Sequence, residues 1–214
     1  MMILFDFDGT LADSISLGIE LINSYADKFG YKKVAPEKVK GLSARMLIKE
    51  SHLSFWKLPY LVCFIRKRLE ENSDKITKIG QIDILLAKLK DAGFTMGILT
   101  SNSFKNISYF LKKYNLESYF SYIRTDVSMF GKTKALKKAK RCINSSIIYV
   151  GDELRDIEAC RKINIPVVSV SWGLNTFEVL NQANKNFVAK NIEEAFNLIV
   201  SLAHQYKPAH NEKD

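Results

Sequence analysis

The pattern that most constrains this chain lies in its first dozen residues, where a short apolar run ends in two carboxylates followed by Gly and Thr. The run at residues 3–5 is typical of a buried strand. Because side chains alternate along a strand, we expect Asp6 and Asp8 on the same side where the strand stops, with Gly9 turning the chain away. Two carboxylates that close repel each other unless a cation or a shared proton intervenes. The pattern therefore favours metal-assisted chemistry on a carboxylate.

The rest of the chain alternates between helix-like and strand-like patterns. Apolar spacing predicts helices and no strand over residues 14–78. After Gly80 it predicts helices that alternate with strands near residues 94–99, 122–123, 146–150 and 167–170. Such alternation predicts an α/β fold, with a Rossmann-like parallel sheet and helices on both faces.

The change of pattern predicts a divided organisation. We expect an α/β core of residues 1–14 and 79–203, an all-helical cap of residues 15–78, and a polar tail of residues 204–214. An insertion directly after the first strand stands over the carboxyl ends of the strands, where parallel sheets bind ligands. The cap is therefore expected to act as a lid over the site.

The charge pattern and the cysteine content indicate which binding partners and which cellular compartment to expect. The net charge is +9, and its Lys and Arg runs at residues 66–68 and 132–141 carry apolar residues at helical spacing. We interpret them as solvated helix faces and expect no nucleic-acid partner, because no reading motif accompanies them. No signal peptide or membrane span is expected. Three widely spaced cysteines are expected to be buried, reduced thiols, which favours a cytoplasmic protein. Either a monomer or a homodimer is expected.

Four motifs in a fixed order resemble those of the haloacid dehalogenase (HAD) superfamily, and the match covers nearly the whole chain. They are Asp6-Phe7-Asp8-Gly9-Thr10-Leu11, Thr100, Lys132 and Gly151-Asp152-Glu153-Leu154-Arg155-Asp156. Within the superfamily the chain is similar to the phosphoglycolate-phosphatase-like branch with a helical cap. The resemblance implies a HAD-like phosphatase that requires Mg²⁺ and hydrolyses a phosphomonoester of a small metabolite. Phosphoglycolate is the leading substrate hypothesis.

The resemblance also implies roles for three charged residues. Asp6 would be the nucleophile that forms an aspartyl-phosphate, which divides the hydrolysis into two easier steps. Asp8 would protonate the leaving group and then activate water. Lys132 would balance the charges of Asp6 and the phosphoryl group. Lys134 is its rival, and Lys132 is preferred because it directly follows Gly131 at an expected helix start.

The remaining motif residues would bind phosphate and metal. Thr100 would hold a phosphoryl oxygen, assisted by Ser101 and Asn102 at a helix start; an alternative for Thr100 is a helix cap. The implied Mg²⁺ ligands are Asp6, the backbone carbonyl of Asp8, and Asp152.

Supporting and specificity roles are assigned less directly. Asp156 would act through water or position Lys132, Thr10 would orient the Asp6 loop, and Glu153 would support the site or cap the helix. In the cap, Arg45 and Lys49 would contact a second anionic group of the substrate; the alternative is that both are exposed charges on a helix.

Two other function classes remain open. A sugar-phosphate mutase of the same branch is one, although such enzymes tend to carry a histidine soon after the first motif, and residues 14–31 contain none. A non-catalytic protein that binds nucleic acid or a partner on a HAD scaffold is the other. The presence of Asp8, which dehalogenases of the superfamily lack, favours phosphoryl transfer.

Overall fold

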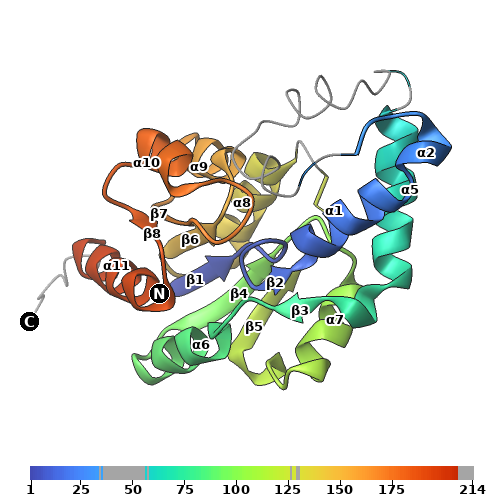
Figure 1. Ribbon diagram of the computed structural model, residues 1–214. Coiled ribbons are helices and arrows are strands. Elements are labelled where there is room, and N and C mark those ends of the chain that lie inside the picture. Colours follow the sequence, from blue (N-terminus) through green and yellow to red (C-terminus); the bar gives the residue numbers. More distant parts are fainter. Residues whose placement is uncertain (34, 36–55, 57, 126, 129–130, 207–214) are drawn as a thin grey trace, which may run out of the picture.

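A six-stranded parallel sheet forms the centre of the computed structural model, which describes residues 1–33, 35, 56, 58–125, 127–128 and 131–206. The strand order is β5-β4-β1-β6-β7-β8, and every pairing is parallel (Figure 1). The strands are β1 (Met2–Phe5), β4 (Thr95–Leu99), β5 (Phe120–Arg124), β6 (Ile147–Gly151), β7 (Val167–Val170) and β8 (Val188–Ala189). Because β1 lies between β4 and β6, it places its carboxyl end in the middle of the sheet edge.

Helices cover both faces of the sheet, as the alternation of side chains along β1 requires. They are α6 (Ile82–Asp91), α7 (Phe104–Lys113), α8 (Lys132–Cys142), α9 (Leu154–Arg161), α10 (Phe177–Ala183) and α11 (Ile192–Gln205). Ile3 and Phe5 belong to one apolar core, with α6, α7 and α11. Leu4 points to the other face and packs in a second core with α8, α9 and α10. The predicted fold class is confirmed.

A smaller helical part is connected to the sheet through a two-stranded antiparallel ribbon, β2 (Ala12–Asp13) and β3 (Thr77–Lys78). It contains α1 (Ser14–Ser24), α2 (Ala26–Phe29), α5 (Leu58–Glu71) and the 3₁₀ turn η2 (Ser73–Lys75). Another 3₁₀ turn, η3 (Glu117–Tyr119), belongs to the sheet domain and precedes β5. α1 and α5 lie side by side and share a small apolar core that includes Phe29, Leu61 and Ile65 (Figure 1).

Several predicted details were wrong. β3 is a strand within the segment expected to have none. Cys63 and Cys142 are exposed, and only Cys160 is buried. The elements α10 and β8 were not predicted, because they are short and carry weak periodicity. Among the described helices, none combines the length and apolarity needed to cross a membrane.

Candidate functional site

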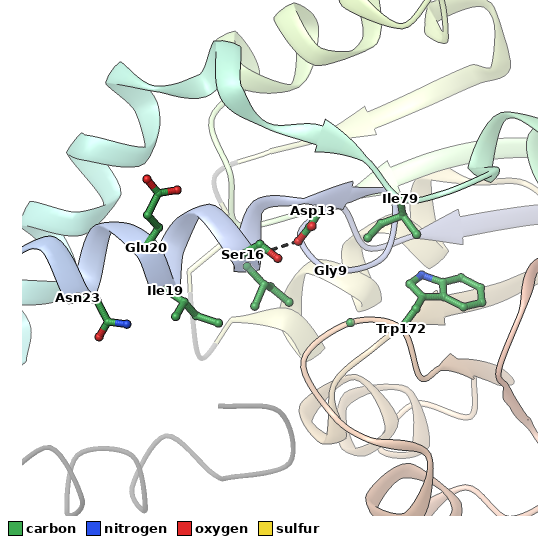
Figure 2. Close-up of a pocket in the computed structure, with 10 residues that line it drawn as sticks. Gly9, Asp13, Ser16, Ile19, Glu20, Asn23, Ile79 and Trp172 are labelled. Carbon is green, nitrogen blue, oxygen red and sulfur yellow. Dashed lines mark hydrogen bonds between the residues drawn. The ribbon is translucent and has the colours of Figure 1, made fainter. Parts of the chain in front are cut away.

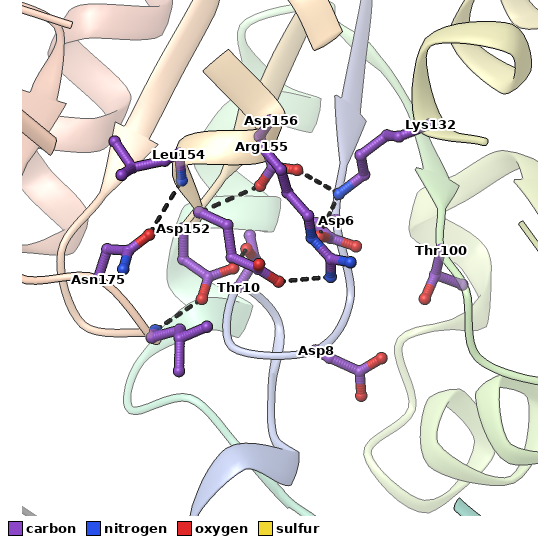
Figure 3. A network of polar contacts seen from close by, with 12 residues as sticks. Asp6, Asp8, Thr10, Thr100, Lys132, Asp152, Leu154, Arg155, Asp156 and Asn175 are labelled. Carbon is purple, nitrogen blue, oxygen red and sulfur yellow. Dashed lines mark hydrogen bonds and ion pairs between the residues drawn. The ribbon is translucent and has the colours of Figure 1, made fainter. Parts of the chain in front are cut away.

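The polar motifs gather at one edge of the sheet, where the parallel strands end. Asp6 and Asp8 follow β1, Thr100 follows β4, Asp152 follows β6, and Lys132 is the first residue of α8. Figure 3 shows these side chains pointing toward a common space from four separate elements. The fold therefore assembles the motifs because parallel strands carry their carboxyl ends to the same edge.

Lys132 bridges two buried carboxylates at the centre of the site. Its Nζ donates to Asp6 Oδ2 at 2.6 Å and to Asp156 Oδ1 (Figure 3). Burial acts to lower the pKa of Lys132, but the charges of Asp156 and Asp6 outweigh it and hold that pKa well above its usual range. Lys134, two residues later, is exposed. The ammonium group that meets Asp6 therefore belongs to Lys132.

Three buried carboxylates form a compact cluster. Asp6, Asp152 and Asp156 each offer an oxygen, and these oxygens lie within 4.8 Å of one another. Burial raises the pKa of Asp152 well above its usual range, and the nearby charges of Asp6 and Asp156 raise it further. Hard oxygen ligands held this close fit a divalent cation such as Mg²⁺, which relieves their repulsion.

The loop after β7 holds Asp152 from the side opposite the nucleophile. The backbone N–H of Leu174 donates to Asp152 Oδ2 at 2.7 Å, and Thr10 Oγ1 donates to Asp152 Oδ1 at 3.0 Å. Asn175 Oδ1 accepts from the N–H of Leu154 at 2.9 Å, which ties this loop to the start of α9. Thr10 was expected to orient the Asp6 loop by a side-chain hydrogen bond, and the structure gives Asp152 as the partner of its hydroxyl group. No motif pointed to the loop at residues 171–175.

Two glycines allow the backbone to approach Asp152. A Cβ atom at Gly9 would lie 2.3 Å from Asp152 Oδ2, and one at Gly173 would lie 2.2 Å from the same atom. Gly9 also has a φ of +76°, which favours glycine. The space beside Asp152 is therefore closed by backbone, and a larger residue would displace a carboxylate of the cluster.

We expect Gly173→Ala to weaken the binding of a divalent cation at this cluster by about 10- to 100-fold, the usual cost of disturbing groups that orient a metal ligand. The added methyl group would displace Asp152 Oδ2. Calorimetric titration with Mg²⁺ measures this change. The unfolding midpoint of the metal-free variant controls for misfolding, and an unchanged affinity for Mg²⁺ in a folded variant would contradict the assignment of Asp152 to a cation site.

Asp8 has its own set of hydrogen bonds, separate from the cluster. Ser14 Oγ donates to Asp8 Oδ1 at 2.5 Å, and Asn102 Nδ2 donates to the same oxygen at 3.1 Å. Burial raises the pKa of Asp8; the hydrogen bond from Ser14 opposes this, and the charge of Asp6 adds to it. Asn102, expected at the phosphate, therefore directs its side chain to Asp8. The sequence alone did not single out Ser14.

The turn after β4 begins with Thr100 and brings Ser101 to the recess that Asp6 and Asp8 also line. Thr100 is fully buried, and its Oγ1 accepts from the N–H of Asn102 at 3.0 Å. The N-cap of α7 is Ser103, whose side chain accepts from the N–H of Asn106. Thr100 therefore does not serve as the helix cap, and its hydroxyl proton can donate to a ligand.

Glu153 and Arg155 complete the described site. Glu153 is the N-cap residue of α9, and its N–H donates to Asp156 Oδ2 at 3.2 Å. Burial raises the pKa of Glu153 to about 7, although the charge of Arg155 acts to lower it. The sequence did not predict a role for Arg155, because helical spacing does not show which way a side chain at the start of a helix points.

Two cavities flank α1. One of about 580 Å³ contains Asp8 and Ser101 and reaches Cys63 and Lys67 of α5. The other, of about 630 Å³, is lined by Ile19 and Glu20 of α1 and by Trp172 (Figure 2). The second cavity meets the site at Gly9 and Gly173, whereas the first has the carboxylate residue Asp8 in its lining. Arg45 and Lys49 lie outside the described residues.

Comparisons with a family profile, with curated proteins and with solved structures all match this chain to haloacid dehalogenase-like hydrolases or phosphatases. The profile of the family described as haloacid dehalogenase-like hydrolase matches residues 3–170. A phosphoglycolate phosphatase of Synechococcus elongatus is 30% identical over 95% of this chain and 99% of its own. A Caldanaerobacter subterraneus protein that carries the name of the pyrophosphatase PpaX is 25% identical over 92% and 93%. Among solved structures, a predicted phosphatase from Clostridium acetobutylicum has a TM-score of 0.76 at 22% identity, covering 94% of this chain and 98% of its own.

Proposed function

Because the chain belongs to the haloacid dehalogenase-like hydrolase family, we propose that it is a Mg²⁺-dependent phosphatase that hydrolyses a small phosphomonoester. The observation that carries the proposal is the buried Asp6–Lys132–Asp156 arrangement beside a separately held Asp8. One carboxylate is thus fixed next to a cation while a second is placed at the mouth of a cavity.

In the first step, a carboxylate oxygen of Asp6 attacks phosphorus and forms a P–O bond, while the bond from phosphorus to the substrate oxygen breaks. Asp8 gives its proton to the departing oxygen, so the leaving group departs as a neutral alcohol. Lys132 stays in place beside Asp6 and offsets the negative charge of the phosphoryl group. The products of this step are an aspartyl-phosphate and an alcohol.

In the second step, water attacks the aspartyl-phosphate. Asp8, now a carboxylate, takes a proton from the water, the new P–O bond forms, and the bond from Asp6 to phosphorus breaks. Ser14 and Asn102 keep the Asp8 carboxylate oriented in both steps. Free phosphate is released and Asp6 is regenerated.

The carboxylate cluster would hold the cation. The protein ligands would be Asp6, Asp152 and the backbone carbonyl of Asp8, with Asp156 acting through water and as the partner of Lys132. When bound, Mg²⁺ supplies positive charge to the phosphoryl oxygens. Thr100 and Ser101 would donate hydrogen bonds to those oxygens from the turn after β4.

The helical part would act as the lid that admits a small substrate. It meets the sheet domain at the β2–β3 ribbon, and its helix α5 forms one side of the cavity that contains Asp8. The leaving group would lie in that cavity. Phosphoglycolate is the leading substrate, since the relative from Synechococcus elongatus is named for it.

Phosphate release from aryl, alkyl and sugar phosphates, measured with and without Mg²⁺, tests the proposal. We expect release only with Mg²⁺, and we expect Asp8→Asn to lower kcat/KM for alkyl phosphates about 10²- to 10⁴-fold, because an alkoxide leaves poorly without a proton. For aryl phosphates, which leave as stable phenolates, kcat/KM should fall much less, since it reports only the steps through formation of the aspartyl-phosphate. Isomerised sugar phosphate in place of free phosphate would identify a mutase, and equal losses of kcat/KM for both leaving groups would contradict the role of Asp8 as the acid of the first step.

A further inference from the structure

Arg155 is a cation at the mouth of the site that the proposed mechanism does not yet use. It lies in the first turn of α9, and its side chain is 38% exposed. Together with Asp6, Asp8, Ser101 and Lys132 it lines the small recess in which the nucleophile ends. Figure 3 shows its guanidinium group extending from α9 over Asp6. A substrate phosphoryl group positioned for attack by Asp6 would therefore enter the space that Arg155 faces.

The hydrogen bonds of Arg155 leave donors available. Its NH2 group donates to Glu153 Oε1 at 2.5 Å, while its Nε is buried and lacks a partner within the described part of the chain. A guanidinium group has five N–H donors in a planar fork that matches the oxygens of a phosphoryl group. Since an unpaired buried donor costs free energy, the contact with Glu153 alone does not satisfy this side chain.

The charges of the described side chains favour a role for Arg155 at the phosphoryl group in addition to that of the proposed Mg²⁺. The acidic side chains at the described site outnumber its basic ones; they are Asp6, Asp8, Asp152, Glu153 and Asp156 against Lys132 and Arg155. Lys132 is held between two carboxylates and is 10% exposed, so much of its charge is already compensated. Arg155 is more accessible, and within the described ranges its ion pair is with the single carboxylate of Glu153. An incoming phosphoryl group would therefore find free hydrogen-bond donors on Arg155, in addition to those proposed for the turn after β4.

We propose that Arg155 is a further catalytic residue, whose guanidinium group binds the nonbridging oxygens of the phosphoryl group during its transfer to and from Asp6. This inference rests on the proposed phosphatase function. Glu153 keeps the guanidinium group directed at the site, and Lys132 continues to serve Asp6. Because the contact is to the phosphoryl group, its contribution does not depend on the leaving group.

Arg155→Met and Arg155→Lys test the proposal. We expect Arg155→Met to lower kcat/KM about 10²- to 10³-fold, the usual effect of removing one preorganised donor from a transition state. The loss should be equal for aryl and alkyl phosphates, unlike that of Asp8→Asn. Arg155→Lys should recover part of it, since lysine keeps the charge and lacks the fork. Arg161→Met is the matched control: Arg161 lies in the last turn of the same helix and donates to the carbonyl of Ala183.

Binding of orthovanadate, measured by calorimetry, provides a readout that needs no turnover. We expect Arg155→Met to weaken it at least about tenfold with an unchanged unfolding midpoint, while Arg161→Met binds as wild type does. A loss of activity confined to substrates with a second anionic group would assign Arg155 to the leaving group and overturn the proposal, as would unchanged vanadate binding. A wild type that binds vanadate through Arg155 without hydrolysing any phosphomonoester would overturn the proposed function and leave this contact standing.

Discussion

Asp6→Asn is expected to abolish phosphate release, lowering kcat by a factor on the order of 10⁴ to 10⁶, the range found when nucleophilic machinery is removed from other enzymes. The amide keeps the shape of the side chain but is far less nucleophilic, so no aspartyl-phosphate forms. Acid-quenched reactions with radiolabelled substrate measure this directly: label should remain on the wild-type chain and be absent from the variant. Release of phosphate by Asp6→Asn at a tenth of the wild-type rate would contradict the mechanism.

The variant is expected to remain folded, because two electrostatic effects oppose each other. Lys132 loses one partner but keeps Asp156, and the carboxylate cluster loses one of its like charges. Thermal unfolding checks this expectation. Glu193→Gln is the matched control for a carboxylate-to-amide change, since Glu193 pairs with Lys88 at the surface and is 64% exposed there. It should leave turnover unchanged and alter stability by no more than about 1 kcal/mol.

Removal of divalent cations is the second change with a large expected effect. A chelator should stop turnover, and Mg²⁺ should restore it, because the clustered carboxylates of Asp6, Asp152 and Asp156 need a cation to face a phosphoryl group. Mg²⁺ should also stabilise the folded chain. At 100 times its Kd, a ligand adds about 2.7 kcal/mol, which for a chain of this size corresponds to a rise in Tm of roughly 5–10 °C.

Asp152→Asn separates a metal effect from a general salt effect. This variant should lose most of the Tm shift produced by Mg²⁺, because it replaces one carboxylate of the cluster with a neutral amide. Glu193→Gln should keep the whole shift. A Tm that rises equally with Mg²⁺ in wild type and in Asp152→Asn would mean that the cation binds elsewhere.

Much of the core could be predicted from the chain alone, because its signals are local. The apolar runs that became β1, β4, β6 and β7 are bounded by turn residues, and their alternation with amphipathic helices determines the fold class. The ribbon strand β3 escaped prediction because two residues carry no periodicity. Pro59 lies in the first turn of α5, where the missing N–H costs no helical bond.

For the site as well, some features could be predicted from the sequence and others could not. The alternation along one strand predicts Asp6 and Asp8, whereas the resemblance to the superfamily's motifs implied Lys132 and Asp152. The positions of Arg45 and Lys49 in the cap stay predictions, since they lie outside the described residues. The partners of each carboxylate were less predictable: Thr10 bonds to Asp152, which lies 142 residues away in the chain.

The sequence by itself determined the parallel sheet and the carboxylates at its edge, because strand periodicity and chain turns act over a few residues. Only the tertiary structure decided that Asn102 and Ser14 hold Asp8, that the loop of Leu174 holds Asp152, and that Arg155 faces the nucleophile. Most of these contacts join residues far apart in the chain. The physical reason is that hydrogen bonds and ion pairs depend on distances of about 3 Å, which only the packed sheet and helices set.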